Sequence, residues 1–341
     1  MLKLAIVILN WNGKHLLERF LPSVIGHCPA YAKIFVADNG SVDGSAGFLK
    51  QHYPGITFLD LKKNHGYTGG YNRSLNLIQA EYYVLLNSDI EVTQGWIDPI
   101  VDIMDKNPDI AACQPKILSW HERSLFEYAG ASGGYIDKYG YPFCRGRVFG
   151  HLEEDSGQYN ASVDVFWATG ACMFVRGSDF HLAGKLDNDF FAHMEEIDLC
   201  WRLKRMGKRV ICLPLSVVYH VGGGTLPKNN PRKTYLNFRN NLLLLAKNLP
   251  ARQFYLVLLK RLILDQVAAA KFLLSGQHQD FLAVYKATFS VLRNIRKKRK
   301  EGKALPYIAV SGVYGKSIVK EYYLMGKKRF SQLDASRFMN L

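Results

Sequence analysis

The chain has 341 residues, of which 48% are hydrophobic and 21% charged, a composition typical of globular proteins. It contains no low-complexity tract and no internal repeat, which excludes disordered, collagen-like and solenoid proteins. At about 150 residues per domain, the length predicts two domains, or one large domain with an appendage.

The formal net charge of +15 is unevenly placed along the chain. Residues 250–341 hold 18 Lys/Arg and 5 Asp/Glu, whereas residues 1–249 hold 26 and 24. The sequence therefore predicts a nearly neutral body followed by a basic region, and we expect any acidic partner to bind the basic region.

Short apolar runs alternate with amphipathic segments in the first part of the chain. Strands are expected at residues 4–9, 33–37, 56–59 and 82–86, and helices at residues 16–25, 44–52 and 71–79. This alternation predicts a mainly parallel sheet with helices on both faces, whose ligand lies outside the carboxyl ends of the strands. Segments rich in Asn, Asp and Gly occupy those ends, at residues 10–13, 38–44, 64–72 and 87–91. Such segments are also typical of turns, but four of them at one sheet edge favour a binding site.

The later part of the chain is less regular. Residues 128–159 are expected to form a long loop or a hairpin, and residues 165–175 a strand interrupted at Gly170-Ala171. Further expectations are a helix at 190–206, two short strands at 210–213 and 217–219, and a helix at 231–249. Beyond residue 250 the chain is expected to be largely helical.

The cysteines and the apolar segments bear on the cellular compartment. None of the six cysteines forms a Cys-x-x-Cys pair, so we expect no zinc site of the usual spacing and interpret them as reduced thiols of a cytoplasmic protein. The N-terminal apolar run ends at turn residues 10–13, which favours a strand over a signal peptide. Residues 254–274 are the most apolar stretch, but four charges exclude a membrane span and permit an interfacial helix.

Three groups of polar residues suggest chemistry. Asp89 follows an apolar strand, where a carboxylate can hold a divalent cation against a diphosphate. Glu195, Glu196 and Asp198 lie among apolar neighbours, so we expect at least one carboxylate to face a cleft, where burial raises its pKa and makes it a better base. His220 ends a predicted strand before the glycine run 222–224, and this position favours a functional role more than the position of a lone histidine would.

Taken together, these stretches resemble family 2 glycosyltransferases of the GT-A fold, in the bacterial subgroup that includes rhamnosyl- and galactofuranosyl-transferases. Six motifs carry the resemblance in the family's order: residues 7–13, 36–44, 64–72, 85–91, 167–173 and 190–202. The resemblance implies a GT-A catalytic domain at residues 1–245, with a mixed, mainly parallel sheet and helices on both faces. Residues 246–341 would then form a separate basic, amphipathic helical region.

The resemblance also implies a nucleotide site. Asp38 would accept a hydrogen bond from the imide N–H of a pyrimidine ring. Asn12 and the loop 64–70 would line the nucleotide pocket, with Asn64 in that loop and with Gly69 and Gly70 allowing the backbone to approach the ligand. Asn87 stands at the first position of the family's Asp-x-Asp motif, where its amide could bind the metal or the ribose.

A metal and a base complete the implied site. Asp89 would hold Mg²⁺ or Mn²⁺ on the diphosphate, and His220 matches a histidine that completes the metal site in some relatives. Glu196 stands where the family's acidic pair provides the base, usually an aspartate; Glu195 and Asp198 are the alternatives. The metal would neutralise the leaving diphosphate, and the base would deprotonate an acceptor hydroxyl that displaces it with inversion.

The expected donor is a pyrimidine nucleotide-sugar, dTDP-rhamnose or a UDP-hexose, and the expected acceptor is a saccharide or a lipid-linked sugar in surface polysaccharide synthesis. Two alternatives stay open: a sugar nucleotidyltransferase and a non-catalytic nucleotide-binding scaffold at a membrane. Nucleotidyltransferases of this kind usually carry a Gly-rich basic loop after the first strand, and this sequence lacks one. Asn87 keeps the scaffold in consideration.

The C-terminal basic region has one predicted amphipathic helix at residues 281–295, followed by five consecutive basic residues, 296–300. A solvated helix end, nucleic acid and an anionic membrane surface are the three interpretations. No nucleic-acid-binding fold is recognisable, so we expect no nucleic-acid partner. We favour the membrane surface, because basic residues and an interfacial helix at 254–274 would act together there. The predicted location is the cytoplasmic side of the cell membrane, as a peripheral protein.

Overall fold

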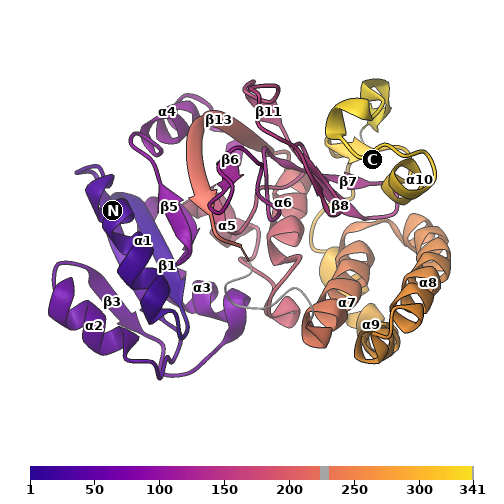
Figure 1. Cartoon of the computed structure of the whole chain (residues 1–341), viewed down its shortest axis with the longest axis horizontal. Helices are drawn as coiled ribbons and strands as arrows, with labels where there is room; N and C mark the ends of the chain where they lie inside the picture. The colour runs from indigo at the N-terminus through magenta and orange to yellow at the C-terminus, as the bar shows by residue number, and fades with distance from the viewer. Residues whose placement is uncertain (223–229, 340–341) are drawn as a thin grey trace.

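The computed structural model describes residues 1–222 and 230–339, and its elements alternate as the sequence predicts (Figure 1). Within these residues, nine strands form the main sheet: β1 (Leu2–Asn10), β2 (Ala32–Asp38), β3 (Thr57–Asp60), β4 (Ala80–Asn87), β5 (Ile90–Val92), β6 (Ile110–Ser119), β11 (Val163–Asp164), β12 (Cys172–Arg176) and β13 (Arg209–His220). Their order is β11-β13-β6-β12-β4-β1-β2-β3, with β5 beside β13.

The main sheet is mixed and mainly parallel, as predicted. The neighbours β4, β1, β2 and β3 run parallel, and β13 runs parallel to β6. β12 runs antiparallel between β4 and β6, and β5 and β11 run antiparallel to β13. The carboxyl ends of β1, β2 and β4 therefore meet at one edge.

Helices cover both faces of this sheet (Figure 1). They are α1 (Lys14–Gly26), α2 (Ser45–His52), α3 (Gly66–Asn76), α4 (Asp98–Lys106), α5 (Gly177–Leu182), the 3₁₀ turn η1 (Asn188–Phe190) and α6 (Glu195–Arg205). Alternate side chains of β1 enter different cores: Leu4, Ile6 and Ile8 lie in one cluster, and Ala5 and Val7 in the other. The two-residue period of a strand thus gives the sheet two hydrophobic faces.

A smaller sheet lies beside the main one. It joins β7 (Gly134–Asp137), β8 (Pro142–Cys144), β9 (Arg147–Val148) and β10 (His151–Leu152) to β14 (Val313–Tyr314) and β15 (Phe338–Met339). The predicted hairpin at residues 128–159 is thus a set of short strands, and it pairs with residues near the C-terminus. Sequence alone missed this pairing because β14 and β15 are only two residues long.

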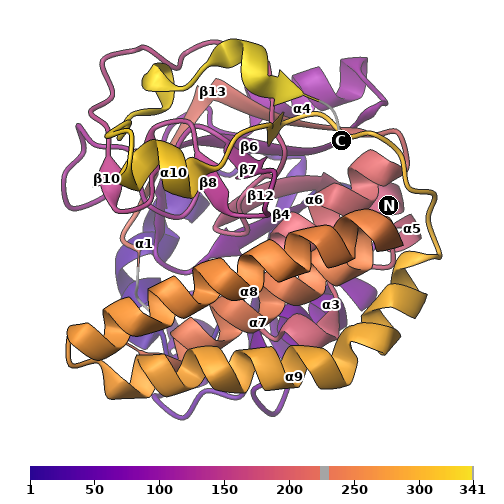
Figure 2. The ribbon, with the colours of Figure 1, turned by 90° about the vertical axis from the view of Figure 1, so that its right-hand side faces the viewer.

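The rest of the C-terminal region is helical, as predicted. It contains α7 (Pro231–Asn248), α8 (Ala251–Leu274), α9 (His278–Gly302), α10 (Ile318–Tyr323) and the 3₁₀ turns η2 (Phe330–Gln332) and η3 (Ala335–Arg337). Figure 2 shows α7, α8 and α9 side by side along one flank of the molecule. α7 runs across the predicted boundary between residues 1–245 and 246–341, so this division into two domains stays a prediction.

Five predicted elements differ clearly from the elements of the structure. The helix expected at 71–79 is α3, which begins at Gly66, so residues 66–70 are helical rather than a loop. The strand expected at 165–175 begins only at Cys172, and the helix expected at 190–206 begins only at Glu195. The strands expected at 210–213 and 217–219 are one strand, β13, with a register shift between Leu213 and Val217. The first three differences lie at element ends, where assigned bounds vary most, and the fourth lies at an irregularity inside β13.

The end of α9 packs directly on α7. A Cβ atom on Gly302 would lie 1.9 Å from the carbonyl oxygen of Lys247, so only glycine fits there. We expect Gly302→Ala to lower the free energy of unfolding by about 1–3 kcal/mol, because the helices must separate. Gly47→Ala, in exposed α2 with nothing near the added Cβ, is the control and should raise it by about 0.5–1 kcal/mol. Urea unfolding checks both; equal effects would contradict this packing.

Candidate active site

Hydrogen bonds cross-link the loops that follow β1 and β2. Asn10 Nδ2 donates to Oδ1 of Asp38 over 3.0 Å and to Oγ of Ser41 over 3.1 Å. The backbone N–H of Asn12 donates to Ser41 Oγ, and Asn12 Oδ1 accepts from the backbone N–H of Val42 over 2.8 Å. Asp38 is 3% exposed, and its Oδ2 accepts from the backbone N–H of Ser41. The structure thus brings Asn12 and Asp38 together at the predicted sheet edge.

Asn39 ties this edge to α3. Its Nδ2 donates to Oδ1 of Asn64 and to the carbonyl of Gly66, and its Oδ1 accepts from the backbone N–H of His65. Asn39 is 2% exposed, so these bonds form in a site from which water is largely excluded. Because Asn39 directly follows Asp38, its bond to Asn64 brings the exposed Asn64 side chain to this sheet edge.

Gly69 and Gly70 lie inside α3 rather than in the predicted loop. A Cβ atom on Gly70 would lie 2.7 Å from Cδ1 of Leu9, so this glycine allows α3 to approach β1. The first amides of α3, those of Tyr67 and Thr68, donate to the carbonyl of Phe191. The helix start thus connects the sheet edge to the segment before α6.

Asp89 and His220 meet at the ends of β4 and β13. His220 Nε2 lies 3.1 Å from Asp89 Oδ1 and 3.4 Å from Asn87 Nδ2. On the other side of the ring, Nδ1 lies 3.2 Å from Oε2 of Glu127. Asp89, His220 and Glu127 are 6%, 4% and 5% exposed. Sequence analysis missed Glu127, which lies 93 positions from His220 and has no motif of its own.

The charges in this group depend on one another. Burial disfavours the charged imidazole, but the carboxylates of Asp89 and Glu127 outweigh it and raise the pKa of His220 well above its ordinary value. Burial likewise opposes ionisation of Asp89, but attraction to His220 holds the pKa of that carboxyl below its ordinary value. The ring is therefore held between two carboxylates.

These donors fit a divalent cation. A carboxylate oxygen and an imidazole nitrogen lie within 3.1 Å of each other, and both are ligand types for first-row metals. Ligating histidines commonly present their second ring nitrogen to a carboxylate, as His220 presents Nδ1 to Glu127. Gly222 has φ 72°, and a Cβ there would lie 2.7 Å from Glu127 Oε1, which explains one glycine of the predicted run. Gly223 and Gly224 lie outside the described residues.

The segment before α6 is held in an unusual backbone conformation. Phe191, His193 and Met194 have φ values of 64°, 68° and 72°, in the left-handed region that side chains with a Cβ rarely adopt. Asn240 on α7 is 0% exposed, and its Nδ2 lies within 2.9 Å of the carbonyls of Phe190, Ala192 and His193. The contact with α7 therefore holds the strained segment in place.

Glu195 and Glu196 begin α6, and both have an unpartnered oxygen. Within residues 1–222 and 230–339, Oε2 of each glutamate has no hydrogen-bond partner, although it is buried. Burial raises the pKa of Glu196 to about 7, and burial with repulsion from Glu196 raises the pKa of Glu195 well above its ordinary value. Burial thus favours the protonated form of both carboxyl groups.

Tyr67 places the glutamates near the sheet edge. Its backbone N–H donates to the carbonyl of Phe191, four residues before Glu195. Burial raises the pKa of the Tyr67 hydroxyl, and Tyr71 and the charges of Glu195 and Glu196 raise it further. Tyr67 Oη donates to the carbonyl of Gly170 over 2.6 Å, and the backbone N–H of Asn87 donates to the carbonyl of Ala171. The turn at Gly170-Ala171 thus connects the glutamates to the end of β4, which precedes Asp89.

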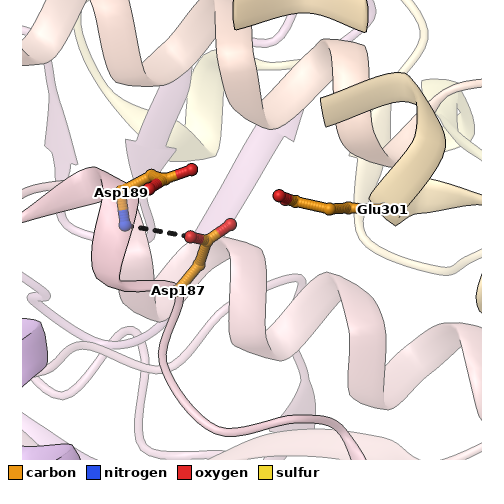
Figure 3. A group of neighbouring side chains, drawn as sticks. All are labelled: Asp187, Asp189 and Glu301. Carbon is orange, nitrogen blue, oxygen red and sulfur yellow. Dashed lines mark hydrogen bonds between the residues drawn. The ribbon is translucent and has the colours of Figure 1, made fainter. Parts of the chain in front are cut away.

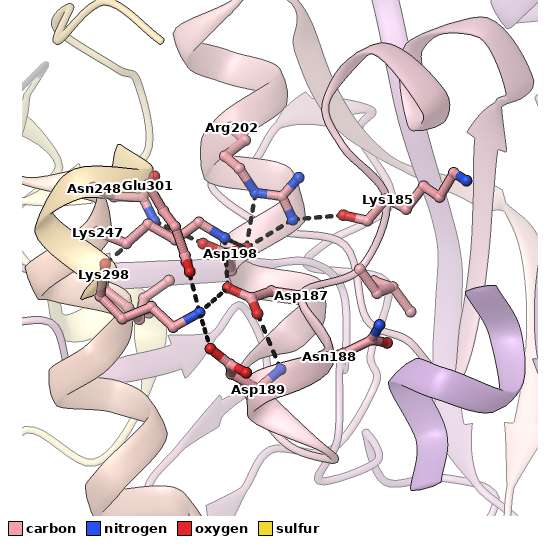
Figure 4. Close-up of polar contacts among 12 residues, drawn as sticks. Lys185, Asp187, Asn188, Asp189, Asp198, Arg202, Lys247, Asn248, Lys298 and Glu301 are labelled. Carbon is pink, nitrogen blue, oxygen red and sulfur yellow. Dashed lines mark hydrogen bonds and ion pairs between the residues drawn. The ribbon is translucent and has the colours of Figure 1, made fainter. Parts of the chain in front are cut away.

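Asp198 differs from the two glutamates. It is 0% exposed, and its oxygens accept hydrogen bonds from Arg202, Lys247 and Asn248 over 2.8–2.9 Å (Figure 4). Burial opposes its ionisation, but Arg202 and Lys247 outweigh burial and lower the pKa of Asp198. An ionised carboxylate with these partners is suited to anchoring α6.

Three carboxylates form a second cluster beside Asp198. Figure 3 shows Asp187, Asp189 and Glu301 pointing toward one another, with oxygens within 4.8 Å. Lys298 Nζ stands among them, at 2.6 Å, 2.8 Å and 2.7 Å from their oxygens (Figure 4). The lysine ammonium supplies the positive charge, so this cluster does not fit a metal ion.

Trp167, the first residue of the motif at 167–173, is part of the core. Trp167 is 2% exposed, and its Nε1 donates to the carbonyl of Tyr135. Its ring packs so closely on Gly134 that a Cβ there would lie 2.0 Å away. Trp167 therefore supports the small sheet and has no free face for a sugar.

Residues 5–160 match the family described as Glycosyl transferase family 2. N-acetylglucosaminyl-diphospho-decaprenol L-rhamnosyltransferase of Mycobacterium tuberculosis is 27% identical over 233 residues, which cover 64% of this chain and 75% of that protein. Low-salt glycan biosynthesis hexosyltransferase Agl10 of Haloferax volcanii is 26% identical over 247 residues, covering 70% and 74%. Rhamnosyltransferase WbbL of Escherichia coli is 24% identical and covers 63% and 82%.

Solved structures share the fold. GalNAc-T7 with UDP, GalNAc and Mn²⁺ has a TM-score of 0.58 at 15% identity, and the match covers 72% of this chain but only 48% of that one. Mannosyltransferase PcManGT of Pyrobaculum calidifontis, with GDP-Man and Mn²⁺, has a TM-score of 0.52 at 13% identity and covers 88% and 84%. At such identities the likeness concerns the fold alone.

We expect Lys298→Met to lower the free energy of unfolding by about 3 kcal/mol, because the half-buried carboxylates of Asp187, Asp189 and Glu301 lose their buried partner. Burial works to raise the pKa of Asp187, but Lys247 and Lys298 outweigh it and lower the pKa. The stabilising effect of Asp187 is therefore present above its unfolded pKa of about 4 and is lost as the pH falls below that value.

Urea unfolding at neutral and acid pH measures this loss. Lys297→Met, at the exposed neighbouring position, is the matched control and should cost less than about 1 kcal/mol. Adding Asp187→Asn to Lys298→Met should restore part of the stability. A Lys298→Met protein as stable as the control would refute this account of the cluster.

Proposed function

Since the chain is a glycosyltransferase with a family 2 domain on the GT-A fold, we propose that it moves a sugar from a pyrimidine nucleotide-sugar to a hydroxyl group, with inversion and with a divalent cation. The observation that carries this proposal is the pair of glutamates with buried, unpartnered oxygens beside the sheet edge that holds Asp89 and His220. A base and a cation site are the two parts that this reaction needs.

Glu196 is the proposed catalytic base. Its pKa of about 7 suits proton abstraction near neutral pH, and its free Oε2 can accept the proton. As Glu196 takes the proton, the acceptor oxygen forms a bond to the anomeric carbon, and the bond from that carbon to the diphosphate oxygen breaks on the opposite face. Glu195, whose protonated form burial favours, would donate a hydrogen bond to the acceptor in that form, and Asp198 would anchor the helix that carries both.

The cation would be Mg²⁺ or Mn²⁺, held by Asp89 and His220. When bound, it would supply positive charge to the departing diphosphate. Glu127 would orient the His220 ring, and Asn87 would reach the ribose or the cation. The Mn²⁺ named with two of the similar structures supports this assignment.

Asp38 is the proposed reader of the pyrimidine. Its oxygens already accept from Asn10 and Ser41, which orients the carboxylate, and an ionised carboxylate has about four acceptor sites in all. A site therefore remains for the imide N–H of uracil or thymine. Asn12 and Asn64 would border the ribose side of this pocket. The relatives named rhamnosyltransferases support dTDP-rhamnose as the donor, with a UDP-hexose as the alternative.

A saccharide or a lipid-linked sugar is the proposed acceptor, with the protein at the cytoplasmic surface of a membrane. Among the described residues, no helix has the length and apolar character that a membrane crossing requires. Neither alternative from the sequence gains support: the relatives are named as transferases, and no basic Gly-rich loop follows β1.

We expect Glu196→Gln to lower kcat by about 100-fold or more, because the base is lost. Glu195→Gln is the matched control and should retain most activity, because glutamine resembles a protonated glutamate. In the wild type, kcat/KM should rise with pH and level off above about 7, the pKa of Glu196.

Both variants should keep the thermal stabilisation by donor and Mn²⁺, which shows that the fold and the donor site survive. A Glu196→Gln enzyme with wild-type kcat would move the base to another residue. A loss of activity in Glu195→Gln alone would make Glu195 the base and Glu196 the hydrogen-bond donor.

The cation site has its own test. We expect Asp89→Asn to abolish the Mn²⁺-dependent rise in melting temperature with a UDP- or dTDP-sugar, because the anionic ligand is lost. Glu127→Gln should weaken Mn²⁺ affinity by about 10–100-fold through the orientation of His220. Glu91→Gln is the control, since Glu91 bonds Trp120 and Arg123 instead. Metal dependence that survives Asp89→Asn would contradict this site.

A further inference from the structure

The outward face of α8 is apolar. Leu256, Leu259, Ile263 and Val267 are 58–68% exposed, and Leu274 is 89% exposed. They recur every three or four residues, except for one gap that the small Ala270 fills, so they form one stripe along the helix. The opposite face, with Phe254, Val257 and Ala269, packs inward. The stripe is therefore additional to the face that the core uses.

α9 continues this surface. Leu282, Tyr285, Phe289 and Leu292 are 37–64% exposed, whereas Val284, Ala287 and Val291 are buried. The apolar positions predicted at residues 281–295 thus divide between two faces. Tyr285 Oη donates to Oε1 of Gln266 on α8 over 2.6 Å, so the partly exposed Tyr285 reaches α8, and Figure 2 shows the two helices side by side.

The charge of this surface has one sign. The carboxylates of α8 and α9 are Asp265 and Asp280, which are 1% and 8% exposed, and Glu301, which pairs with Lys298. Seven exposed side chains of α8 and α9 are charged and have no carboxylate partner within the described ranges. All of them are basic: Arg252, Lys260, Lys271, Lys286, Arg293, Arg296 and Lys300. Exposed apolar side chains with only cations around them complement an anionic, oily surface.

A hollow lies where the start of α8 meets the end of α9. Its volume is about 280 Å³, and its lining consists of Ala251, Tyr255, Arg296, Arg299, Lys300 and Lys303. Arg299 is fixed by donating to the carbonyls of Ala246 and Leu249. Arg296, Lys300 and Lys303 pair with no carboxylate of residues 1–222 or 230–339, so their charge is available to a ligand.

We propose that this face docks on an anionic phospholipid bilayer, with the stripes of α8 and α9 in the interface and a headgroup phosphate in the basic hollow. This docking face rests on the proposed sugar transfer at a membrane surface and adds how the protein would be held there. A second copy of the chain would bring the same positive charge to the face, and nucleic acid would leave the stripes uncovered.

Vesicle sedimentation of the full chain tests the proposal. We expect binding to phosphatidylcholine vesicles with about a quarter phosphatidylglycerol, and little binding to phosphatidylcholine alone. The triple variant R296Q/K300Q/K303Q should bind the anionic vesicles about 100-fold more weakly, since each basic residue near the surface contributes about fivefold. The variant K33Q/K50Q/K106Q removes three exposed lysines of the body and is the matched control.

The apolar stripe has a separate variant. I263D/V267D should lose vesicle binding and keep its melting temperature, because both side chains are exposed. Equal binding to neutral and anionic vesicles, or equal losses in the two triple variants, would overturn the proposal. So would a dimer in solution that I263D/V267D dissociates, or binding of single-stranded RNA that excludes the vesicles.

Donor binding separates this inference from the proposed function. The Mn²⁺-dependent rise in melting temperature with a nucleotide-sugar should be the same in all these variants, because none of the substituted residues lies in the site. Vesicle binding without donor stabilisation would refute only the transferase assignment of the site. Donor stabilisation without anionic vesicle binding would refute only the docking face.

Discussion

The buried ion pairs between α6, the preceding segment and the C-terminal helices are the constraint on which the site depends. Lys247 joins Asp187 to Asp198, and Lys298 joins Asp187 to Asp189 and Glu301. Each charge is buried or half-buried, so each needs its partner to remain ionised. Because these pairs reach from α7 and α9 to the segment before α6, the C-terminal helices are part of the candidate active site.

The same low-polarity environment gives neighbouring carboxyl groups opposite properties. Asp198 has three donors and stays ionised, whereas Glu195 and Glu196, at the start of the same helix, have unpartnered oxygens and raised pKa values. Burial alone acts in the same direction on all three. Pairing decides which carboxylate supports structure and which is free to accept a proton, and the strained segment held by Asn240 keeps the free ones in position.

The C-terminal helices α7, α8 and α9 have inward and outward faces with different contacts. The inward faces of α7 and α9 hold the segment before α6, through Asn240, Lys247 and Lys298. The outward faces of α8 and α9 carry apolar side chains and unpaired cations. The proposed lipid-docking surface and the surface that holds the segment before α6 are therefore parts of neighbouring helices, an arrangement that would hold the candidate site at a fixed height above a bilayer.

The sequence predicted the alternation of strands and helices, the mainly parallel sheet, and the edge where Asn12, Asp38 and Asp89 lie. They follow from local periods and from short motifs at strand ends, which need few distant contacts. The bounds of α3 and α6 could not be predicted, because contacts with Phe191 and Asn240, which are distant from these helix starts in sequence, fix where the helices begin.

Sequence alone thus determined the fold class and the residues from which the site is drawn. Only the tertiary structure decided what those residues do. Glu127 meets His220, and Lys247 meets Asp198, across 93 and 49 positions with no shared motif. A pKa depends on burial and on partners within a few ångströms, and neither is written locally in the chain. The same holds for the outward stripe of α8, since an amphipathic pattern does not say which of two apolar faces the core will cover.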